Sequence, residues 1–467
     1  MKFTLRSLLA FVLLLSTTPL SAQTYNVLYN FGAHPGDPSN PRYSGTISQG
    51  RHGYLYTSTD DRWTDGIGSA FFLTTGGHLT VMHSFNISDG KAPVGGLSLG
   101  LDGYYYGTAT FGGDAGFGTV FNMRADNGGV GTLYSFSGGD DGAYPNAAPV
   151  QSIGGNFFGT TVGTSNTHGS IYKISAFGEF TLLHVFTGSD GSAPYAPLVQ
   201  AADGNFYGTT FEGGAFGYGT IFRISRWGDF TVLYHFDSNH GAHPYAPLVQ
   251  AADGNFYGVT TQGGGFGAGV VFKLKPHGDV IVLHSFTGGN DGSNEVGGLV
   301  QATDGNFYGT NDLGGAYGWG VLFRISSTGV FKVLHSFDWV TGASPQAALV
   351  QQTNGILYGT TAVGGSGDSG TSYSLDLKLA PFIRFLPASG QVGSNVQLLG
   401  QGFFGATGVS FNGVPTGFST IYDTYMVAPV PTGATSGYIT VTTATGTLTS
   451  DKPFIVTPLD SALELKP

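Results

Sequence analysis

DGNFYGTT, at residues 203–210, is the clearest copy of a glycine-flanked aromatic phrase that recurs along this chain. The seven copies are HGYLYTST (52–59), DGYYYGTA (102–109), GGNFFGTT (154–161), DGNFYGTT (203–210), DGNFYGVT (253–260), DGNFYGTN (304–311) and NGILYGTT (354–361). Their shared glycines are 50, 52, 49, 50, 51 and 50 residues apart. A nearly constant period of about 40–50 residues is typical of propellers and similar arrays.

Each repeat contains four short strand-like runs. In the copy from 194 to 236 these runs are APLVQA (196–201), NFYGTT (205–210), GTIFRIS (219–225) and FTVLYHF (230–236). The runs are rich in β-branched and aromatic residues, and Gly, Asp or Pro bounds each of them. Both faces of the runs are largely apolar, as expected for sheets that pack against a neighbour on each side. One repeat therefore predicts one four-stranded blade.

The fourth run of the seventh repeat is missing, and a spare copy lies at the N-terminus. Repeats one to six each end in a run that closes with Phe, whereas the seventh stops at its third run, GTSYSLD (370–376). TYNVLYNF (24–31) precedes the first repeat and ends in Phe31. We expect this strand to complete the last blade. The predicted fold is all-β, a seven-bladed β-propeller with 3+1 strand closure and no open edge.

Residues 24–377 resemble the tandem repeats called GloVer. The resemblance rests on DGNFYGTT and on the pattern GG-x-x-G-x-G-T-I-F that follows it, best seen at 203–222. It implies an exported bacterial protein built from a repeat array, and it brings no catalytic residues. The first repeat departs most from the pattern, because it has no glycine pair after HGYLYTST.

The period stops after the seventh repeat and the composition changes from 381 to 458. The phrases VSFNG (409–413) and PTGATSG (431–437) resemble an IPT/TIG domain, which implies an immunoglobulin-like β-sandwich. The alternating run ITVT (439–442) and regular turn signals agree with a small sandwich. The expected plan is a signal peptide (1–22), the propeller (23–380), the IPT/TIG domain (381–458) and a tail (459–467).

The N-terminus predicts export. Lys2 and Arg6 precede an apolar run (8–15), and Ser21-Ala22 offers a small-residue cleavage site. The chain has no cysteine, so neither a lipoprotein anchor nor a disulfide framework is expected. No later stretch approaches the roughly 20 apolar residues of a membrane-spanning helix. We expect a secreted or cell-surface protein with no transmembrane segment in the mature chain.

The charge and composition of the chain disfavour some classes of binding partner. Cleavage removes two positive charges and no acidic residue, which takes the net charge from −11 to −13. An acidic chain of this kind disfavours nucleic acid and anionic membranes as partners. Aromatic residues make up 14% of the chain and recur at fixed positions, which excludes a disordered low-complexity protein. We expect a monomer whose partner is an extracellular glycan or a surface protein.

The longer links of each repeat, second-to-third and fourth-to-first, share one face, and propellers most often bind ligands on a loop face or in the channel. The Gly-rich loops (112–118, 212–219, 263–269 and 314–320) precede strands, which favours turns over phosphate cradles. The Asp-Gly loops favour turns, with Ca²⁺ as the alternative ligand, and their carboxylates are Asp89, Asp140, Asp141, Asp190 and Asp291. We assign no metal ligand and no cofactor.

A polar aromatic recurs two residues before the closing Phe of each repeat. It is histidine in four repeats and tyrosine in three: His83, His184, His284, His335, Tyr29, Tyr134 and Tyr234. Its presence in every repeat indicates a packing position with a polar tip rather than a metal or catalytic site.

The irregular first repeat and its neighbours carry the ligand hypothesis. The loop at 59–66 replaces the glycine pair with carboxylates, an arginine and a tryptophan, and ring closure places repeats six, seven and one side by side. Flat rings beside carboxylates suit sugars, through stacking and hydroxyl hydrogen bonds. We expect a glycan to bind in this sector, at Trp63, Trp319, Trp339, Asp60, Asp61 and Asp65.

Three functional classes stay open. The favoured one is a non-catalytic binding or adhesion protein, with no catalytic residue assigned. The alternative is a polysaccharide hydrolase or lyase that pairs Asp60 with Asp65 or Glu212, although few glutamates and no nucleophile motif occur in the repeats. The third is a purely structural cell-surface protein.

Overall fold

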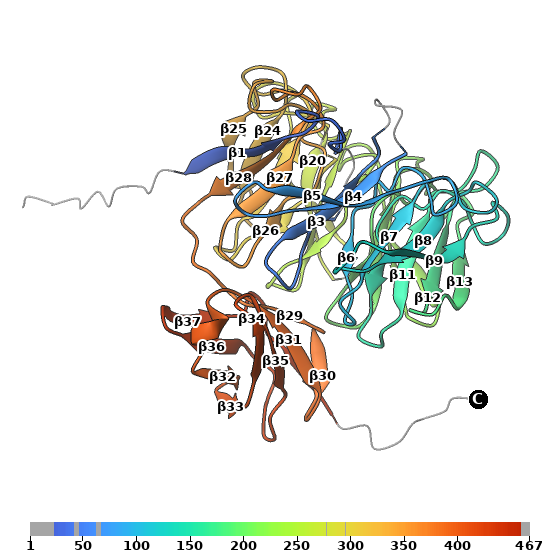
Figure 1. The fold of residues 1–467 in the computed structure, drawn as a ribbon. Coiled ribbons are helices and arrows are strands. Elements are labelled where there is room, and N and C mark those ends of the chain that lie inside the picture. The colour runs from blue at the N-terminus through green and yellow to red at the C-terminus, as the bar shows by residue number, and fades with distance from the viewer. Residues whose placement is uncertain (1–22, 42–45, 62–66, 277, 295, 459–467) are drawn as a thin grey trace, which may run out of the picture.

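The structure, a computed structural model, describes residues 23–41, 46–61, 67–276, 278–294 and 296–458. Within these ranges the chain is all-β apart from one short 3₁₀ helix, η1 (Phe403–Gly405). Seven four-stranded antiparallel sheets of the repeat region come first among the described residues, and a smaller C-terminal unit follows them. Figure 1 shows the C-terminal unit, coloured orange to red, beneath the repeat sheets.

The repeated phrase supplies the turn and the second strand of every sheet, and the first strand precedes it. The first strands hold only two residues: β2 (Ser48–Gln49), β6 (Ser98–Leu99), β10 (Val150–Gln151), β14 (Val199–Gln200), β18 (Val249–Gln250), β22 (Val300–Gln301) and β26 (Val350–Gln351). The second strands are β3 (Leu55–Thr59), β7 (Tyr105–Ala109), β11 (Phe157–Thr161), β15 (Phe206–Thr210), β19 (Phe256–Thr260), β23 (Phe307–Asn311) and β27 (Leu357–Thr360). The first strand is shorter than the run APLVQA predicts, because only its last residues pair with the second strand.

The outer strands complete the sheets. The third strands are β4 (Ser69–Leu73), β8 (Thr119–Met123), β12 (Ser170–Ile174), β16 (Thr220–Ile224), β20 (Val270–Leu274), β24 (Val321–Ile325) and β28 (Thr371–Asp376). The fourth strands are β5 (Leu79–Ser84), β9 (Val130–Ser135), β13 (Phe180–Val185), β17 (Phe230–His235), β21 (Val280–Ser285), β25 (Phe331–Ser336) and, in the seventh sheet, β1 (Thr24–Asn30). We number the sheets 1 to 7 in the order of their first strands.

Hydrogen bonds within the turn explain why the repeated phrase contains aspartate, glycine and tyrosine. In sheet 4, Asp203 Oδ1 accepts from the Asn205 N–H (3.0 Å) and Oδ2 accepts from Tyr207 Oη (2.9 Å). Gly204 has φ +81°, a left-handed conformation that glycine adopts without steric cost. The carboxylate thus closes the turn between the first two strands and also fixes the tyrosine on the second. The same tyrosine-to-turn bond recurs in sheets 2, 5 and 6.

The aromatic doublet at the start of each second strand joins neighbouring sheets. Successive strand residues point to opposite faces, so one member of the doublet faces each neighbour. The second member of one doublet stacks on the first member of the next in five consecutive pairs, with centroids 3.8–4.2 Å apart: Tyr56–Tyr105, Tyr106–Phe157, Phe158–Phe206, Tyr207–Phe256 and Tyr257–Phe307. Tyr308 then shares a buried cluster with Leu357. Tyr358 shares one with Leu55, which brings sheet 7 against sheet 1.

The seventh sheet takes its outer strand from the N-terminus, as the sequence predicts. β1 pairs antiparallel with β28, from Thr24 opposite Asp376 to Asn30 opposite Thr371. Tyr25 on β1 stacks on His335 of sheet 6, with ring centroids 3.9 Å apart. Phe31, fully buried, meets Phe71 of sheet 1 edge to face. The first described segment therefore contacts both neighbours of sheet 7.

A glutamine at the end of the first strand ties five of the seven sheets to the one before them. Its Oε1 accepts from a turn N–H of the preceding sheet at four steps, in the pairs Leu101–Gln151, Ala202–Gln250, Ala252–Gln301 and Thr303–Gln351. The same contact joins sheet 7 to sheet 1, where the Thr353 N–H donates to Gln49 Oε1 (2.9 Å). In sheet 2 this position is Leu99.

The C-terminal unit has two four-stranded sheets around one core. One sheet runs in the order β29 (Arg384–Leu386), β31 (Asn395–Leu399), β35 (Tyr425–Pro429) and β34 (Ser419–Tyr422). The other runs β33 (Val414–Thr416), β32 (Gly408–Phe411), β36 (Ile439–Thr443) and β37 (Gly446–Thr449). A parallel pair, β30 (Ser389–Gln391) with β38 (Ile455–Thr457), completes it. Buried side chains from both sheets, including Val396, Met426 and Val441, form the shared core.

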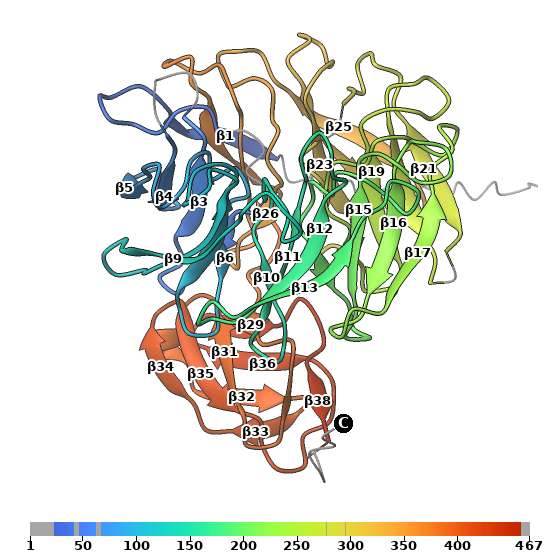
Figure 2. The same cartoon turned by 90° about the vertical axis from the view of Figure 1, so that its right-hand side faces the viewer.

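The C-terminal unit contacts the short first-to-second turns of sheets 7, 1 and 2. Arg51 lies over the Tyr425 ring (4.8 Å) and donates from Nη2 to Gln397 Oε1 (2.8 Å). Thr424 Oγ1 donates to the Arg51 carbonyl (2.7 Å), and Gln401 Nε2 donates to Thr353 Oγ1 (3.0 Å). Both views place this unit on the same side of the ring (Figures 1 and 2). The longer links therefore lie on the opposite face.

We predict that Gln49→Leu lowers the free energy of unfolding by about 1–3 kcal/mol, because it leaves the buried Thr353 N–H without an acceptor. Leucine fits this position in sheet 2, so the change tests the hydrogen bonds rather than the space. Gln200→Leu is the matched control, since Gln200 bonds its own turn carbonyl at Gly204. Urea denaturation should show the larger loss for Gln49→Leu, and equal losses would contradict the role assigned to this contact.

A second prediction concerns pH. Burial lowers the pKa of His335 below its ordinary value near 6.5, and a smaller attraction to Asp338 opposes the shift. The unfolded chain therefore takes up a proton that the folded chain resists, and stability falls as the pH drops below about 6.5. His335→Tyr, which introduces the residue found at the equivalent positions Tyr134 and Tyr234, should reduce the loss in urea midpoint between pH 7.5 and 5.5. His184 shifts in the same direction, so part of the pH dependence should persist. An unchanged pH dependence in the variant would refute the assignment to His335.

Candidate functional site

On the face that carries the longer links, hydrogen-bonded side-chain pairs at the outer rim join a fourth strand to the Asp-Gly loop that follows it. His184 Nε2 lies 3.0 Å from Asp190 Oδ2, and the Thr187 N–H donates to Asp190 Oδ1 (2.8 Å). The same arrangement occurs at His83–Asp89 (2.9 Å) and His284–Asp291 (3.1 Å), while Tyr134 Oη donates to Asp141 Oδ2 (3.1 Å). These carboxylates thus fix the loop backbone to the fourth strand. Among the described residues no group of three or more His, Cys, Asp or Glu is placed to hold a metal ion.

The recurring polar aromatics pack against the next sheet. His184 stacks on Phe230 and His284 stacks on Phe331, with centroids 3.7 and 4.0 Å apart. Burial lowers the pKa of His184, and the attraction of Asp190 partly offsets that shift. The neutral imidazole therefore serves both packing and the loop hydrogen bond.

Two of the tryptophans expected in the ligand sector meet on this face. Trp319, in the Gly-rich loop of sheet 6, is 40% exposed, and its ring lies edge to face with Trp339, centroids 4.7 Å apart. Trp339 Nε1 donates to Asp368 Oδ1 (3.0 Å), a residue of sheet 7 that the sequence interpretation did not include. Trp339 and Asp368 have φ of 68° and 53°, where left-handed backbone strains any residue but glycine. The place of Asp368 is glycine in sheet 4, at Gly217; the place of Trp339 is glycine in some links, such as Gly188, and Ser238 with φ 69° in another.

Of the three carboxylates expected beside these tryptophans, the two that lie within the described residues are buried rather than at the surface. Asp60 and Asp61 follow β3 of sheet 1 and are buried. Asp61 Oδ1 accepts from the Ser39 N–H (2.7 Å) and Thr59 Oγ1 (2.9 Å), and Oδ2 accepts from Ser69 Oγ (2.8 Å). Trp63 and Asp65 lie outside the described residues. Asp61 therefore supports the loop from within, while Asp368 lies at the surface beside Trp339.

A second feature of this face is the mouth of the ring, where each fourth-to-first link turns into the first strand. Every link has one non-glycine residue in left-handed backbone, with φ between 49° and 59°: Asn40, Ala92, Tyr144, Ala193, His243, Asn294 and Ser344. Two main-chain bonds hold this turn; at His243 the N–H donates to the Tyr218 carbonyl and the carbonyl accepts from the Thr261 N–H. The turn fixes the residue two places later, which differs from repeat to repeat.

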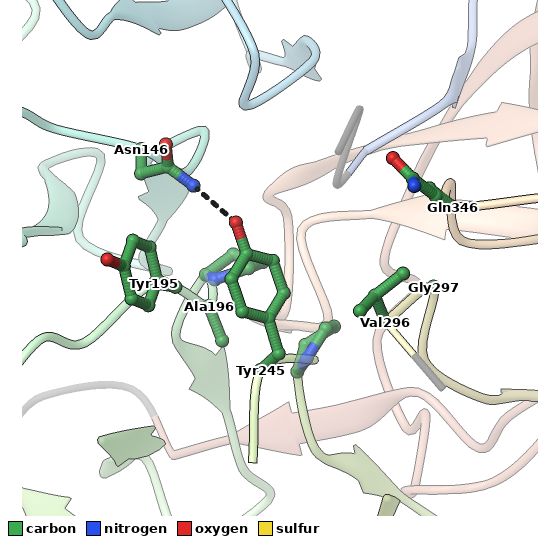
Figure 3. Close-up of a pocket in the computed structure, with 9 residues that line it drawn as sticks. Asn146, Tyr195, Ala196, Tyr245, Val296, Gly297 and Gln346 are labelled. Atoms are coloured by element: carbon green, nitrogen blue, oxygen red, sulfur yellow. Dashed lines mark hydrogen bonds between the residues drawn. The ribbon is translucent and has the colours of Figure 1, made fainter. Parts of the chain in front are cut away.

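Five of these residues line a shallow depression at the mouth that is open to solvent. Figure 3 shows Asn146, Tyr195 and Tyr245 on one side of the opening and Val296 with Gln346 on the other. The two tyrosine rings stack with centroids 4.8 Å apart, and Asn146 Nδ2 donates to Tyr245 Oη (3.4 Å). The sequence interpretation missed this set. The signal that could have found it is the changing residue after a proline that six of the seven links share.

In the described part of the chain, no helix is both long and apolar enough to span a membrane.

Comparison with known proteins shows the family through the repeats. The model of the Gloeobacter/Verrucomicrobia repeat matches residues 14–164 and 148–373, and no curated protein matches the chain. Similar solved structures include the extracellular domain of a putative hybrid two-component system from B. thetaiotaomicron (9% identity, 93% of this chain and 58% of that one, TM-score 0.49). Others are a putative 6-phosphogluconolactonase from Bacteroides fragilis (16%, 65% and 87%, 0.46) and TolB from Acinetobacter baumannii (16%, 62% and 64%, 0.40). The chain thus spans less than two thirds of the length of TolB and of the two-component domain. What these proteins bind or catalyse is not carried over, whereas the repeat match covers most of the sequence. The chain belongs to the Gloeobacter/Verrucomicrobia repeat family.

Proposed function

We propose that this protein is an exported, non-catalytic binding protein whose long-loop face recognises glycans. The observation that carries the proposal is the contact between Trp319, Trp339 and Asp368. Trp339 and Asp368 both have left-handed backbone, and they bond to each other at the surface. The place of Asp368 is glycine in sheets 2, 4, 5 and 6, whereas the place of Trp339 is glycine in some links and Ser238, also left-handed, in another. Strained backbone of this kind costs about 1–3 kcal/mol per residue and is concentrated at functional sites.

The chemistry of the sector suits a sugar chain. Trp319 offers a partly exposed indole for stacking on the apolar face of a pyranose ring. Asp368 Oδ1 accepts a hydrogen bond from the Trp339 indole. Because Asp368 is exposed, its Oδ2 can accept a hydrogen bond from a sugar hydroxyl. In this proposal Asp61 supports the neighbouring loop, and Trp63, Asp60 and Asp65 extend the sector into sheet 1.

The architecture supports recognition at a cell surface. We infer that the seven sheets form a closed seven-bladed propeller and that residues 381–458 form an IPT/TIG domain with an immunoglobulin-like sandwich. Export by the N-terminal signal peptide would place both units outside the cytoplasm. The C-terminal unit covers short turns on one face, which leaves the long-loop face for a glycan or a surface protein.

The hydrolase or lyase alternative has less support. Glu212 is exposed in sheet 4, and Asp60 is buried in sheet 1, so the two are three sheets apart in the ring. Acid–base glycoside cleavage needs two carboxylates about 5–9.5 Å apart across one bond. The separation of the sheets favours binding over catalysis for this pair.

We predict that the wild-type protein binds one or more glycans on an array, and that Trp319→Ala with Trp339→Ala reduces this binding about tenfold or more. Trp227→Ala is the matched control, because Trp227 is 73% exposed in a short third-to-fourth turn. An array without signal, or equal signals from all three proteins, would count against glycan recognition in this sector. Release of reducing sugars from mixed polysaccharides would instead favour the enzyme.

A further inference from the structure

We propose that three exposed aromatic side chains, Phe216, Phe266 and Tyr317, extend the glycan site along the long-loop face, so that the protein binds a long neutral polysaccharide in preference to a short oligosaccharide. This inference rests on the glycan-binding function proposed above, and it names the class of glycan. The three residues occupy the tips of the Gly-rich loops in sheets 4, 5 and 6, where they are 60%, 67% and 62% exposed.

Each tip residue stands at the third position of a four-residue turn that main-chain bonds hold in place. In sheet 4 the Gly217 N–H donates to the Gly214 carbonyl (3.4 Å), and the Ala215 N–H donates to His235 Nδ1 (3.1 Å) on the fourth strand. The Gly214 N–H donates to the Gly188 carbonyl (2.8 Å), which anchors the turn to the preceding link. The equivalent three bonds occur in sheets 5 and 6. The backbone therefore fixes where each ring starts.

The loops leave the rings uncovered. The residues before and after each tip are glycine or alanine, so the loop itself places no large side chain against the ring. A methyl group added at Gly217, Gly267 or Gly318 would meet no atom of the described residues within 4 Å, apart from its own neighbours in the chain. A flat ring in such a position can stack on the apolar face of a pyranose.

The fold does not require an aromatic residue at the tip. The same position is Ala115 in sheet 2, Asn166 in sheet 3 and Gly367 in sheet 7, and the turn bond is made in each of these sheets. The rings of sheets 4 to 6 are thus not needed to form the turn. Exposed apolar side chains that gather on one face are typical of an interaction surface.

The three rings follow one another around the ring of sheets. Stacked aromatic doublets join sheet 4 to sheet 5 and sheet 5 to sheet 6. Because the tips have the same position in each repeat, the rings lie on one face at the interval between neighbouring sheets. Trp319 follows Tyr317 by two residues in the loop of sheet 6 and contacts Trp339. The series of rings therefore leads into the sector proposed for the glycan.

The separation of the rings favours a polysaccharide over other partners. Each ring stands on its own loop beside residues without bulky side chains, whereas a protein interface has a continuous, closely packed core. A polysaccharide presents pyranose faces at regular intervals, so it can contact separate rings in turn. The net charge of −11 disfavours anionic membranes and anionic polysaccharides. Several weak contacts along one chain strengthen binding, because each bound unit raises the effective concentration of the next.

The test compares long and short glycans of the same sugar on the full chain. The probes are hydroxyethyl cellulose, glycol chitin, xylan and soluble starch, each compared with its disaccharide by calorimetry. We expect at least one polymer to bind about tenfold or more tightly, per sugar unit, than its disaccharide. Equal affinities would overturn this proposal and leave glycan binding in place. Failure of every polymer and disaccharide to bind would overturn both this proposal and the proposed function.

Variants locate the additional affinity. Phe216→Ala, Phe266→Ala and Tyr317→Ala combined should lower the affinity for the polymer about tenfold and leave the affinity for the disaccharide unchanged. Alanine occupies this position in sheet 2, as Ala115, so the turns should form. Phe177→Ala is the matched control and should change neither affinity, because Phe177 is 93% exposed in a short third-to-fourth turn on the opposite face.

Circular dichroism and the urea midpoint confirm that each variant folds. Phe266→Ala alone should give a smaller loss in the same direction, which keeps the test valid if the combined variant does not fold. Unchanged polymer affinity in a folded combined variant, or an equal loss in Phe177→Ala, would overturn the proposal. Self-association of the wild-type protein that the combined variant abolishes, with polymer binding unchanged, would assign the tips to a second copy of the chain instead.

Discussion

The structure depends on one interaction, the stacking of an aromatic doublet between neighbouring sheets. The two residues of each doublet are adjacent on a strand, so they face opposite neighbours and every sheet packs on both sides. In sheets 1 and 7 the first member is leucine, and a tyrosine of the preceding sheet packs with it. Each buried ring contributes about 1.5–3 kcal/mol through burial, and stacking adds about 0.5–1.5 kcal/mol. A sheet with one open side would lose half of these contacts. This explains why the series continues until Tyr358 reaches Leu55 and why the N-terminal strand completes the last sheet.

The residues that hold the sheets and loops together are distinct from the residues that we propose for ligand recognition. Turn carboxylates, rim histidines and first-strand glutamines are occupied by bonds that repeat from sheet to sheet. The positions that vary lie on the long-loop face, either in the sector of Trp339 and Asp368 or at the tips of the Gly-rich loops. Because the scaffold bonds fix the loop backbone, side chains at these positions can change without altering the fold. The C-terminal unit, bound to the turns near Arg51, leaves this face uncovered.

Features that follow from the repeat period could be predicted from the sequence. Side-chain positions that depend on contacts between distant loops could not. The period and the spare run at 24–31 predicted the seven sheets and the origin of the last strand. The sequence also placed Trp319 and Trp339 on the same face, because one lies in a long loop of the sixth repeat and the other in the link that follows it. It did not reveal that Asp61 faces inward to Ser39 and Ser69. The direction of that side chain depends on Ser39, which lies 22 residues away in the sequence, and on Ser69 of the next strand. Asp368 was missed for a related reason: its partner lies on another sheet.

Native-state hydrogen exchange on the full chain tests the central claim that the ring is one cooperative unit closed by β1. The amides of β1 that pair with β28 should exchange as slowly as those of β27, because both open only when the ring unfolds. Protection of β27 and β28 with rapid exchange throughout β1 would show that the N-terminal strand is a loose addition, and would contradict the account.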